Sequence, residues 1–336
     1  MSRFIHSGTI ELISSPSILS YAAAGGRMEG EGPLGSFYDY ISEDSTFGES
    51  SWEKSESRLQ QHALENALKK GNVSEGDISF IFAGDLLNQC TGSAYSIRGT
   101  GIPFIGLYGA CSTMAESLAL ASVFMDNNVG EYNVAMTSSH FCSAERQFRF
   151  PETYGGQRTP TAQWTATASG CVVVSKHSKP PFIKAVTFGK INDLGIKDAN
   201  NMGAAMAPAA YETIKNHLNN CDMKPKDFDL ILTGDLGYIG SEIMCDLFRR
   251  DGIDISSVHN DCGKMIYDVE KQDVHAGGSG CGCSASVLCA VVLDKIKNGE
   301  LKNVLFAATG ALMSTTMVQQ GESIPGISHA VHISCE

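Results

Sequence analysis

Several features that mark particular protein classes are missing from this sequence. Its 336 residues contain no dense cluster of lysine or arginine, and 37 acidic against 25 basic residues give a formal net charge of −12. Nucleic acids and anionic lipid surfaces attract clustered Lys and Arg, so this composition argues against both as general partners. We therefore expect no nucleic acid among the partners of this protein.

Hydrophobic segments long enough to cross a membrane are also missing. No apolar run approaches the about 18 residues that span a bilayer, and residues 1–26 have no continuous apolar stretch of the kind found in signal peptides. The sequence therefore predicts a soluble chain without signal peptide or transmembrane segment. Such a chain would reach a membrane only peripherally, through partners.

The cysteines follow neither a disulfide pattern nor a metal-binding pattern. There are 11, an odd number, spread from Cys90 to Cys335 in a chain far too long to need covalent cross-links. Cys281 and Cys283 form a single C-x-C pair, with no second pair and no His at zinc-finger spacing. We expect free thiols, a reducing compartment and no metal site.

What the sequence does contain is an internal repeat. Residues 78–87 and 228–237 are both short apolar runs that end in or just after Gly-Asp-Leu. Each run is therefore expected to form a buried strand with an aspartate, Asp85 or Asp235, at its carboxyl end.

The repeat continues beyond these strands. Glycine-led turns open two helices of small and apolar residues, and each helix leads into a further apolar strand. The matched segments are 109–124 with 280–292 and 134–137 with 304–308. Strands that alternate with helices typically form parallel βαβ units, so the repeat predicts an α/β fold of two related halves. We place the boundary in the polar segment after the predicted strand 170–175, giving halves at 1–179 and 180–336.

Cys111 is the most informative single residue. It lies where a predicted strand gives way to a helix, and the partial positive charge of a helix N-terminus favours a nucleophilic thiolate. A small buried hydrophobic residue is an equally good interpretation. A nucleophilic Cys needs a base, and the candidates are His140, after the strand that ends at 139, and His275, beside a glycine-rich turn. It is equally consistent with the sequence that neither His is catalytic.

The glycine-rich segment 275–284, which contains Gly278 and Ser279, is a second candidate binding element. It offers many backbone N–H groups at a helix start, and such groups together form an anion-binding site. The segment lacks the glycine spacing and the following acidic residue of a dinucleotide-binding fingerprint. Close helix packing through small residues is the alternative, and both can hold.

This order of elements, with a Cys at the N-terminus of the first buried helix, resembles the thiolase superfamily, whose fold is a duplicated αβαβα unit of five layers. Within the superfamily, the sequence is similar to the stage V sporulation protein AD family from about Gly30 to the C-terminus. The segments that carry the similarity are 31–35, 83–89, 109–113, 144–149, 154–157, 206–210, 259–263 and 276–280.

The resemblance implies a role in the spores of endospore-forming bacteria. It implies binding of pyridine-2,6-dicarboxylic acid (dipicolinic acid) and a part in its uptake during sporulation. The implied partners are other proteins of the same operon, at the spore inner membrane. A homodimer is implied as well, because thiolase folds usually pair through a first-half strand.

The residues depart from the catalytic pattern of the superfamily. In its condensing enzymes, a His at the second-half strand end and a His or Asn in the second glycine-rich turn join the nucleophilic Cys. Here the first position falls on Asp235 and the second falls within 277–279, and neither supplies His or Asn. We therefore predict a binding protein without a cofactor. The alternative is a thiolase-like acyltransferase with Cys111 as nucleophile and His140 or His275 as base.

The predicted ligand is a small planar dianion, and two helix N-termini that face one crevice would offer one donor cluster to each carboxylate. Arg146 and Arg149 could clamp a carboxylate, unless they lie in a solvated loop. Asp85 and Asp235 would repel the ligand unless local hydrogen bonds, protonation or a calcium ion that accompanies the ligand neutralised them. The candidate ligand-binding residues are Asp85, Asn88, Cys111, Ser112, His140, Arg146, Asp235, Gly278 and Ser279.

Overall fold

The computed structural model describes residues 1–149, 157–176 and 179–336. Residues 154–156, which belong to one of the segments that carry the family resemblance, lie outside the described residues. Ten main strands form two sets of five with the same spatial order. This arrangement confirms the predicted α/β class and the duplicated thiolase-like fold.

The first set of strands runs in the order β3 (Ser17–Gly25), β9 (Ala168–Ser175), β7 (Tyr132–Ser139), β5 (Ile78–Gly84) and β6 (Phe104–Gly106). The second runs in the order β10 (Phe182–Phe188), β15 (Gly326–Ser334), β14 (Asn303–Ala311), β11 (Leu230–Thr233) and β12 (His259–Asp261). The two sets join where Ser17 of β3 pairs with Phe182 of β10.

The predicted parallel arrangement holds for only part of each set. β7, β5 and β6 are parallel, as are β14, β11 and β12, whereas β9 and β15 run antiparallel to both of their main neighbours. Between β7 and β9 the chain forms the short helix α5 (Phe141–Arg149), which lies at the end of the sheet. Without a crossover along the face of the sheet, the next strand returns in the opposite direction.

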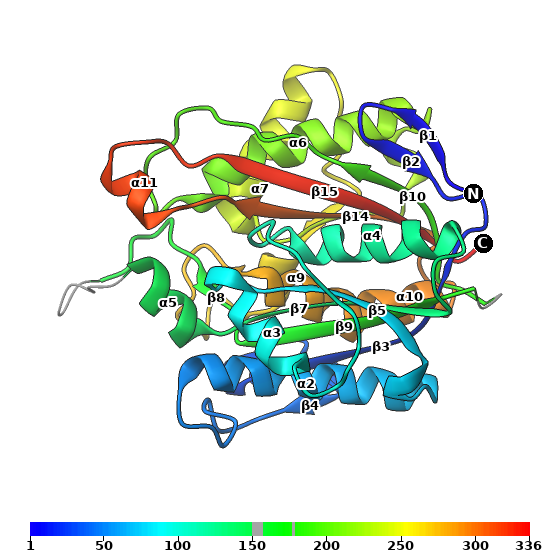
Figure 1. Ribbon diagram of the computed structural model, residues 1–336. Coiled ribbons are helices and arrows are strands. Elements are labelled where there is room, and N and C mark those ends of the chain that lie inside the picture. Colours follow the sequence, from blue (N-terminus) through cyan, green and yellow to red (C-terminus); the bar gives the residue numbers. More distant parts are fainter. Residues whose placement is uncertain (150–156, 177–178) are drawn as a thin grey trace.

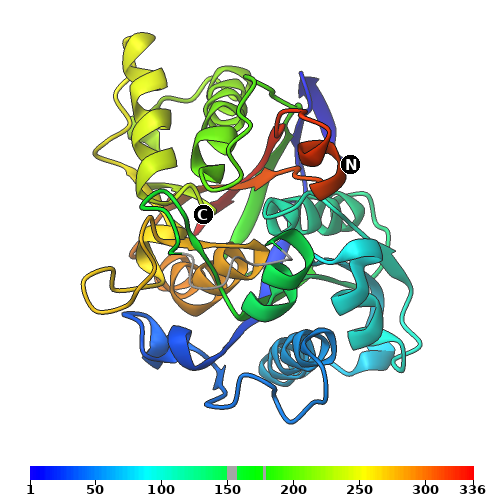
Figure 2. The same cartoon turned by 90° about the vertical axis from the view of Figure 1, so that its left-hand side faces the viewer.

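Helices form three layers around the two sets of strands, as Figures 1 and 2 show. The helices α2 (Trp52–Gly71) and α3 (Thr91–Ile97) cover the outer face of the first set, and α6 (Met202–Asn220) and α7 (Gly237–Arg250) cover the outer face of the second. Between the sets lie α4 (Thr113–Asp126), α9 (Cys281–Val287) and α10 (Leu293–Lys297). The protein therefore has the five layers expected from the superfamily.

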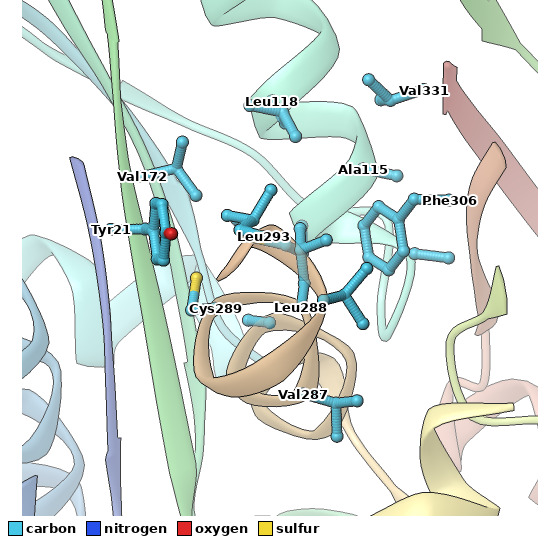
Figure 3. Close-up of a cluster of buried hydrophobic side chains, with 14 of the residues drawn as sticks. Tyr21, Ala115, Leu118, Val172, Val287, Leu288, Cys289, Leu293, Phe306 and Val331 are labelled. Atoms are coloured by element: carbon cyan, nitrogen blue, oxygen red, sulfur yellow. The ribbon is translucent and has the colours of Figure 1, made fainter. Parts of the chain in front are cut away.

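The central layer forms the core of the molecule. Figure 3 shows Leu288 and Leu293 between Val172 of the first set of strands and Phe306 of the second. All four side chains are fully buried. Helices made of small and apolar residues on every side are stable only in such a position, which explains the composition of the two glycine-led helices.

The remaining elements are short. They are β1 (Arg3–His6), β2 (Thr9–Glu11), α1 (Arg27–Gly30), β4 (Tyr40–Ile41), β8 (Trp164–Thr165), α8 (Cys262–Met265), β13 (Gly278–Ser279) and α11 (Thr315–Gln319), with a π-helical turn at Leu288–Val292 and 3-10 turns at Gly35–Phe37, Glu75–Asp77, Asn88–Cys90 and Pro225–Asp227. The expected boundary between residues 179 and 180 lies between β9 and β10 and stays a prediction. Over the part of the chain described, none of the helices has the length and hydrophobicity to cross a membrane.

Candidate functional site

One pocket lies at the end of the molecule where β7 leads into α5 and β14 leads toward α11, the end that faces the viewer in Figure 2. Its walls are mostly apolar and include one arginine, one glutamate and a few neutral polar side chains. The lining residues are Leu86, Tyr108, Ala110, Cys111, Ala144, Glu145, Phe148, Arg149, Gln163, Thr165, Ala199, Asn200, Met202, Ser279, Ala311 and Met313.

Cys111 lines this pocket from a tight turn just before α4. Ala110 has a left-handed backbone (φ +50°), and the Ser112 hydroxyl donates a hydrogen bond to the Gly109 carbonyl (2.7 Å). Strand β14 approaches the turn closely at Gly310, where a Cβ atom would lie 2.3 Å from the Gly109 carbonyl oxygen. Glycine at this position thus lets the two halves of the protein meet directly at Cys111.

Asp235 binds both the second helix N-terminus and the Cys111 thiol. Its buried carboxylate accepts hydrogen bonds from the Ser279 hydroxyl (2.9 Å), the Gly280 N–H (2.9 Å) and the Thr309 hydroxyl (2.8 Å). The thiol of Cys111 is near enough to this carboxylate for each group to shift the pKa of the other. The start of α9 is therefore already occupied by an anion that the protein itself supplies.

Burial, together with this carboxylate, favours the protonated form of the Cys111 thiol. Burial raises the pKa of the thiol well above its usual range, and the charge and hydrogen bond of Asp235 raise it further. Burial also raises the pKa of Asp235, against the lowering effect of its hydrogen-bond donors. Because the thiolate is the nucleophilic form of cysteine, Cys111 is not activated for acyl transfer in this environment.

Neither histidine proposed as a base lines the pocket. The Nε2 atom of His140 lies 2.8 Å from the Ser45 carbonyl oxygen, in a separate cavity that Trp164 also lines, and burial lowers the pKa of the ring. His275 pairs instead with Asp273, with Nε2 and Oδ1 3.1 Å apart. Among the described residues that line the pocket there is no histidine.

Asp85, the counterpart of Asp235 in the first half, braces a turn. Its carboxylate is fully buried and accepts hydrogen bonds from the Leu87 N–H (2.9 Å), the Ser93 N–H (2.7 Å) and the Ser93 hydroxyl (2.8 Å). It does not line the pocket. The local hydrogen bonds are those that the sequence suggests for an aspartate at a strand end.

The other sequence candidates lie around the pocket without lining it. Asn88 and Arg146 border a second pocket, in which Arg146 forms an ion pair with Glu53. Ser112 faces its own turn, and the Gly278 carbonyl accepts a hydrogen bond from the Gln163 side chain (2.8 Å). Of the nine candidate ligand-binding residues, the structure thus places Cys111 and Ser279 in the pocket wall.

Several lining residues carry polar groups that the candidate set omits, among them Arg149 and Gln163. Arg149, one turn after Arg146 on α5, lines the pocket and pairs with Glu145 (3.3 Å). The Gln163 amide donates to the Asp235 carbonyl (2.7 Å) as well as to Gly278, so it ties the two loops together. The sequence names Arg149 as a possible clamp, whereas no local signal points to Gln163.

The described part of the chain contains no grouping of side chains typical of a cation site. Within the described ranges, no group of three or more His, Cys, Asp or Glu side chains is arranged to hold a metal ion. The hydrogen bonds of Asp85 and Asp235 come from protein groups, which leaves the calcium hypothesis to a binding experiment.

Comparison with known sequences gives a match over almost the whole chain. The family model described as Stage V sporulation protein AD (SpoVAD) matches residues 6–334. Stage V sporulation protein AD of Bacillus subtilis (strain 168) is 46% identical over 312 residues, which cover 93% of this chain and 92% of that protein.

Solved structures of thiolase-like enzymes share the fold. The 3-oxoacyl-[acyl-carrier-protein] synthase III from Aquifex aeolicus VF5 is 13% identical, with a TM-score of 0.56 over 95% of this chain and 99% of that chain. Human mitochondrial 3-ketoacyl-CoA thiolase in complex with CoA is also 13% identical, with a TM-score of 0.58 over 97% of this chain and 99% of that chain. At such low identity the likeness concerns the fold alone.

Proposed function

Since this chain belongs to the Stage V sporulation protein AD family, we propose that it binds dipicolinate (pyridine-2,6-dicarboxylate) in the pocket beside Cys111 and acts in the uptake of this anion into the developing spore. One observation carries the binding proposal. The pocket keeps a thiolase-like cysteine but pairs it with Asp235, and it places Arg149 among apolar walls.

The lining of the pocket suits a small planar aromatic anion. Tyr108 and Phe148 offer ring surface, and the planar guanidinium of Arg149 can take a carboxylate through two parallel hydrogen bonds. The second donor cluster expected from the sequence, at the start of α9, already holds Asp235. The second ligand carboxylate is therefore assigned to neutral donors, the Thr165 hydroxyl and the Asn200 amide.

The acyltransferase alternative has less support from the site. An acyl transfer through Cys111 needs a thiolate or a base beside the thiol, whereas Asp235 occupies that place and favours the protonated thiol. His140 and His275 bind Ser45 and Asp273 instead. We therefore rank ligand binding above acyl transfer.

The uptake itself needs partners, and we propose other proteins of the same operon at the spore inner membrane, where this chain is held peripherally. This part of the proposal is supported by the family's role in sporulation.

A homodimer through strand β6 completes the proposed assembly. β6 is the edge of the first set of strands. Phe104, its first residue, and Tyr108, just after its end, are 36% and 44% exposed. An unpaired edge strand is a template for pairing with a second copy. We expect light scattering to give twice the chain mass, and Phe104→Lys, which places a charge on the edge, to give the monomer mass. A dimer that survives this change would place the interface elsewhere.

We expect dipicolinate to bind more tightly than pyridine-2-carboxylate, which lacks one carboxylate. Loss of one set of charge-assisted hydrogen bonds costs about 1.5–3 kcal/mol. The dissociation constant of pyridine-2-carboxylate is therefore expected to be roughly 10 to 150 times that of dipicolinate. Isothermal titration calorimetry of both ligands at one pH and salt concentration measures the difference.

The same titration tests calcium. We expect equal dipicolinate affinity with added Ca²⁺ and with a chelator, because Asp85 and Asp235 are already hydrogen-bonded. A gain with Ca²⁺ that disappears in Asp235→Asn would assign a metal bridge to that residue.

In the comparison of the two pyridine carboxylates, equal affinity would refute a site that recognises both carboxylates of dipicolinate.

A further inference from the structure

A second pair of acidic side chains, Glu56 and Asp85, is buried beside the wall of the pocket. Both are fully buried, and both face Gly92 of α3, where a Cβ atom would lie 3.1 Å from Asp85 Cγ and 3.4 Å from Glu56 Cδ. The two carboxyl groups are thus neighbours in an interior from which water is excluded. Such a pair carries two charges only at high cost.

All the hydrogen bonds that these carboxyl groups accept come from neutral groups. Glu56 receives the Ser138 hydroxyl (3.1 Å) and the Ser143 hydroxyl (2.6 Å), and Asp85 receives the donors of Leu87 and Ser93. In the part of the chain described, no Lys, Arg or His side chain pairs with either carboxyl group. A proton on one of them is the available means of removing the second charge.

The charged and titratable groups on the surrounding elements do not offset this pair. Glu53 of α2 and Arg146 of α5 pair with each other, and His140, after β7, has its pKa lowered by burial. The thiols of Cys90 and of Cys281 on α9 have pKa values raised by burial, so they remain neutral. Burial, followed by the charge of Asp85, raises the pKa of Glu56 to about 8.

Glu56 is linked directly to the helix that forms the pocket wall. Ser143, its shortest hydrogen-bond donor, lies in the first turn of α5, and the next residues of that helix, Ala144, Glu145, Phe148 and Arg149, line the pocket. The contact between α2 and α5 is therefore made in part through the Glu56 carboxyl group.

We propose that Glu56 and Asp85 form a proton-dependent latch that holds α5 in the position required for ligand binding. With one proton on the pair, a single buried charge is stabilised by the neutral donors. When that proton is lost, repulsion between the two carboxylates separates α2, α3 and α5 and displaces Arg149. The predicted effect on ligand affinity rests on the proposed function, because it uses dipicolinate bound beside Arg149.

The test compares the protein with Glu56→Gln, which has the shape of a protonated glutamate but does not titrate. Only the latched form binds, so the apparent dissociation constant rises as the latched fraction falls. With a Glu56 pKa of about 8, we expect dipicolinate affinity to fall about ten-fold from pH 7 to pH 9. The affinity of Glu56→Gln is expected to stay constant. A fall of the same size in both proteins would overturn the latch.

A readout without ligand separates the latch from the proposed function. The sequence has two tryptophans, of which Trp52 begins α2 and Trp164 stacks on Phe141 of α5 with ring centroids 3.8 Å apart. We expect the tryptophan emission to change between pH 7 and pH 9 in the original protein and not in Glu56→Gln. If this occurs while dipicolinate binds at neither pH, the latch stands and the proposed ligand is wrong.

Ser143→Ala provides the second variant, for the case in which Glu56→Gln fails to fold. It removes the bond from α5 and leaves the pair of carboxyl groups in place. We expect affinity at pH 7 to fall toward the pH 9 value of the original protein and to lose its dependence on pH. An unchanged pH profile in Ser143→Ala would show that α5 is not controlled through Glu56.

Discussion

Replacing Arg149 by methionine is expected to weaken dipicolinate binding roughly 10- to 150-fold, because a charge-assisted set of hydrogen bonds contributes about 1.5–3 kcal/mol. Arg149 is the basic side chain of the described pocket lining, and methionine keeps much of its apolar stem. The loss also removes the positive charge that faces Glu145, so the negative charge of this pocket residue is less offset when a dianion binds. Calorimetry at pH 7 measures the change.

Arg146→Met is the matched control on the same helix. Arg146 lies three residues earlier, borders the neighbouring pocket and pairs with Glu53, so its loss is expected to change affinity less than two-fold. Arg149→Met in a Glu145→Gln background separates the lost attraction from the less offset charge of Glu145. If Arg146→Met weakens binding as much as Arg149→Met, the ligand does not lie in the pocket beside Cys111.

Much of the fold was predictable because its signals are local. The two apolar runs that end with Gly-Asp became β5 and β11, and the two glycine-led segments became the buried helices α4 and α9. Composition, periodicity and turn residues decide such elements within a few positions of the chain. The direction of β9 was missed, because it depends on where α5 lies relative to the sheet.

The lining of the pocket was harder to predict, because it depends on long-range packing. Arg146 and Arg149 are alike in sequence context and lie one turn apart on α5, yet they line different pockets, because different distant segments pack around each side chain. Asp235 was expected at the crevice, yet its donors Ser279 and Thr309 come from segments 44 and 74 residues away. No spacing within one segment of the sequence reveals such contacts.

Removal of the Asp235 charge is expected to make Cys111 reactive. In Asp235→Asn the side chain keeps its shape, while the negative charge that raises the pKa of the thiol disappears. Burial still raises this pKa, so the thiol becomes more acidic without reaching the value of an exposed cysteine. Each unit by which the pKa falls gives about ten-fold more thiolate at a pH below the pKa, and alkylation follows the thiolate.

We therefore expect iodoacetamide to modify Cys111 faster in Asp235→Asn than in the original protein at pH 8, because the thiolate fraction rises when the charge of Asp235 is removed. Mass spectrometry of the peptide that contains Cys111 distinguishes it from the other ten cysteines. Asp85→Asn is the matched control, because it changes the equivalent aspartate of the first half, which does not bond to Cys111. An equal rate of alkylation in all three proteins would mean that burial alone keeps the Cys111 thiol unreactive. A faster rate in Asp235→Asn alone would show that Asp235 holds this cysteine in its unreactive form.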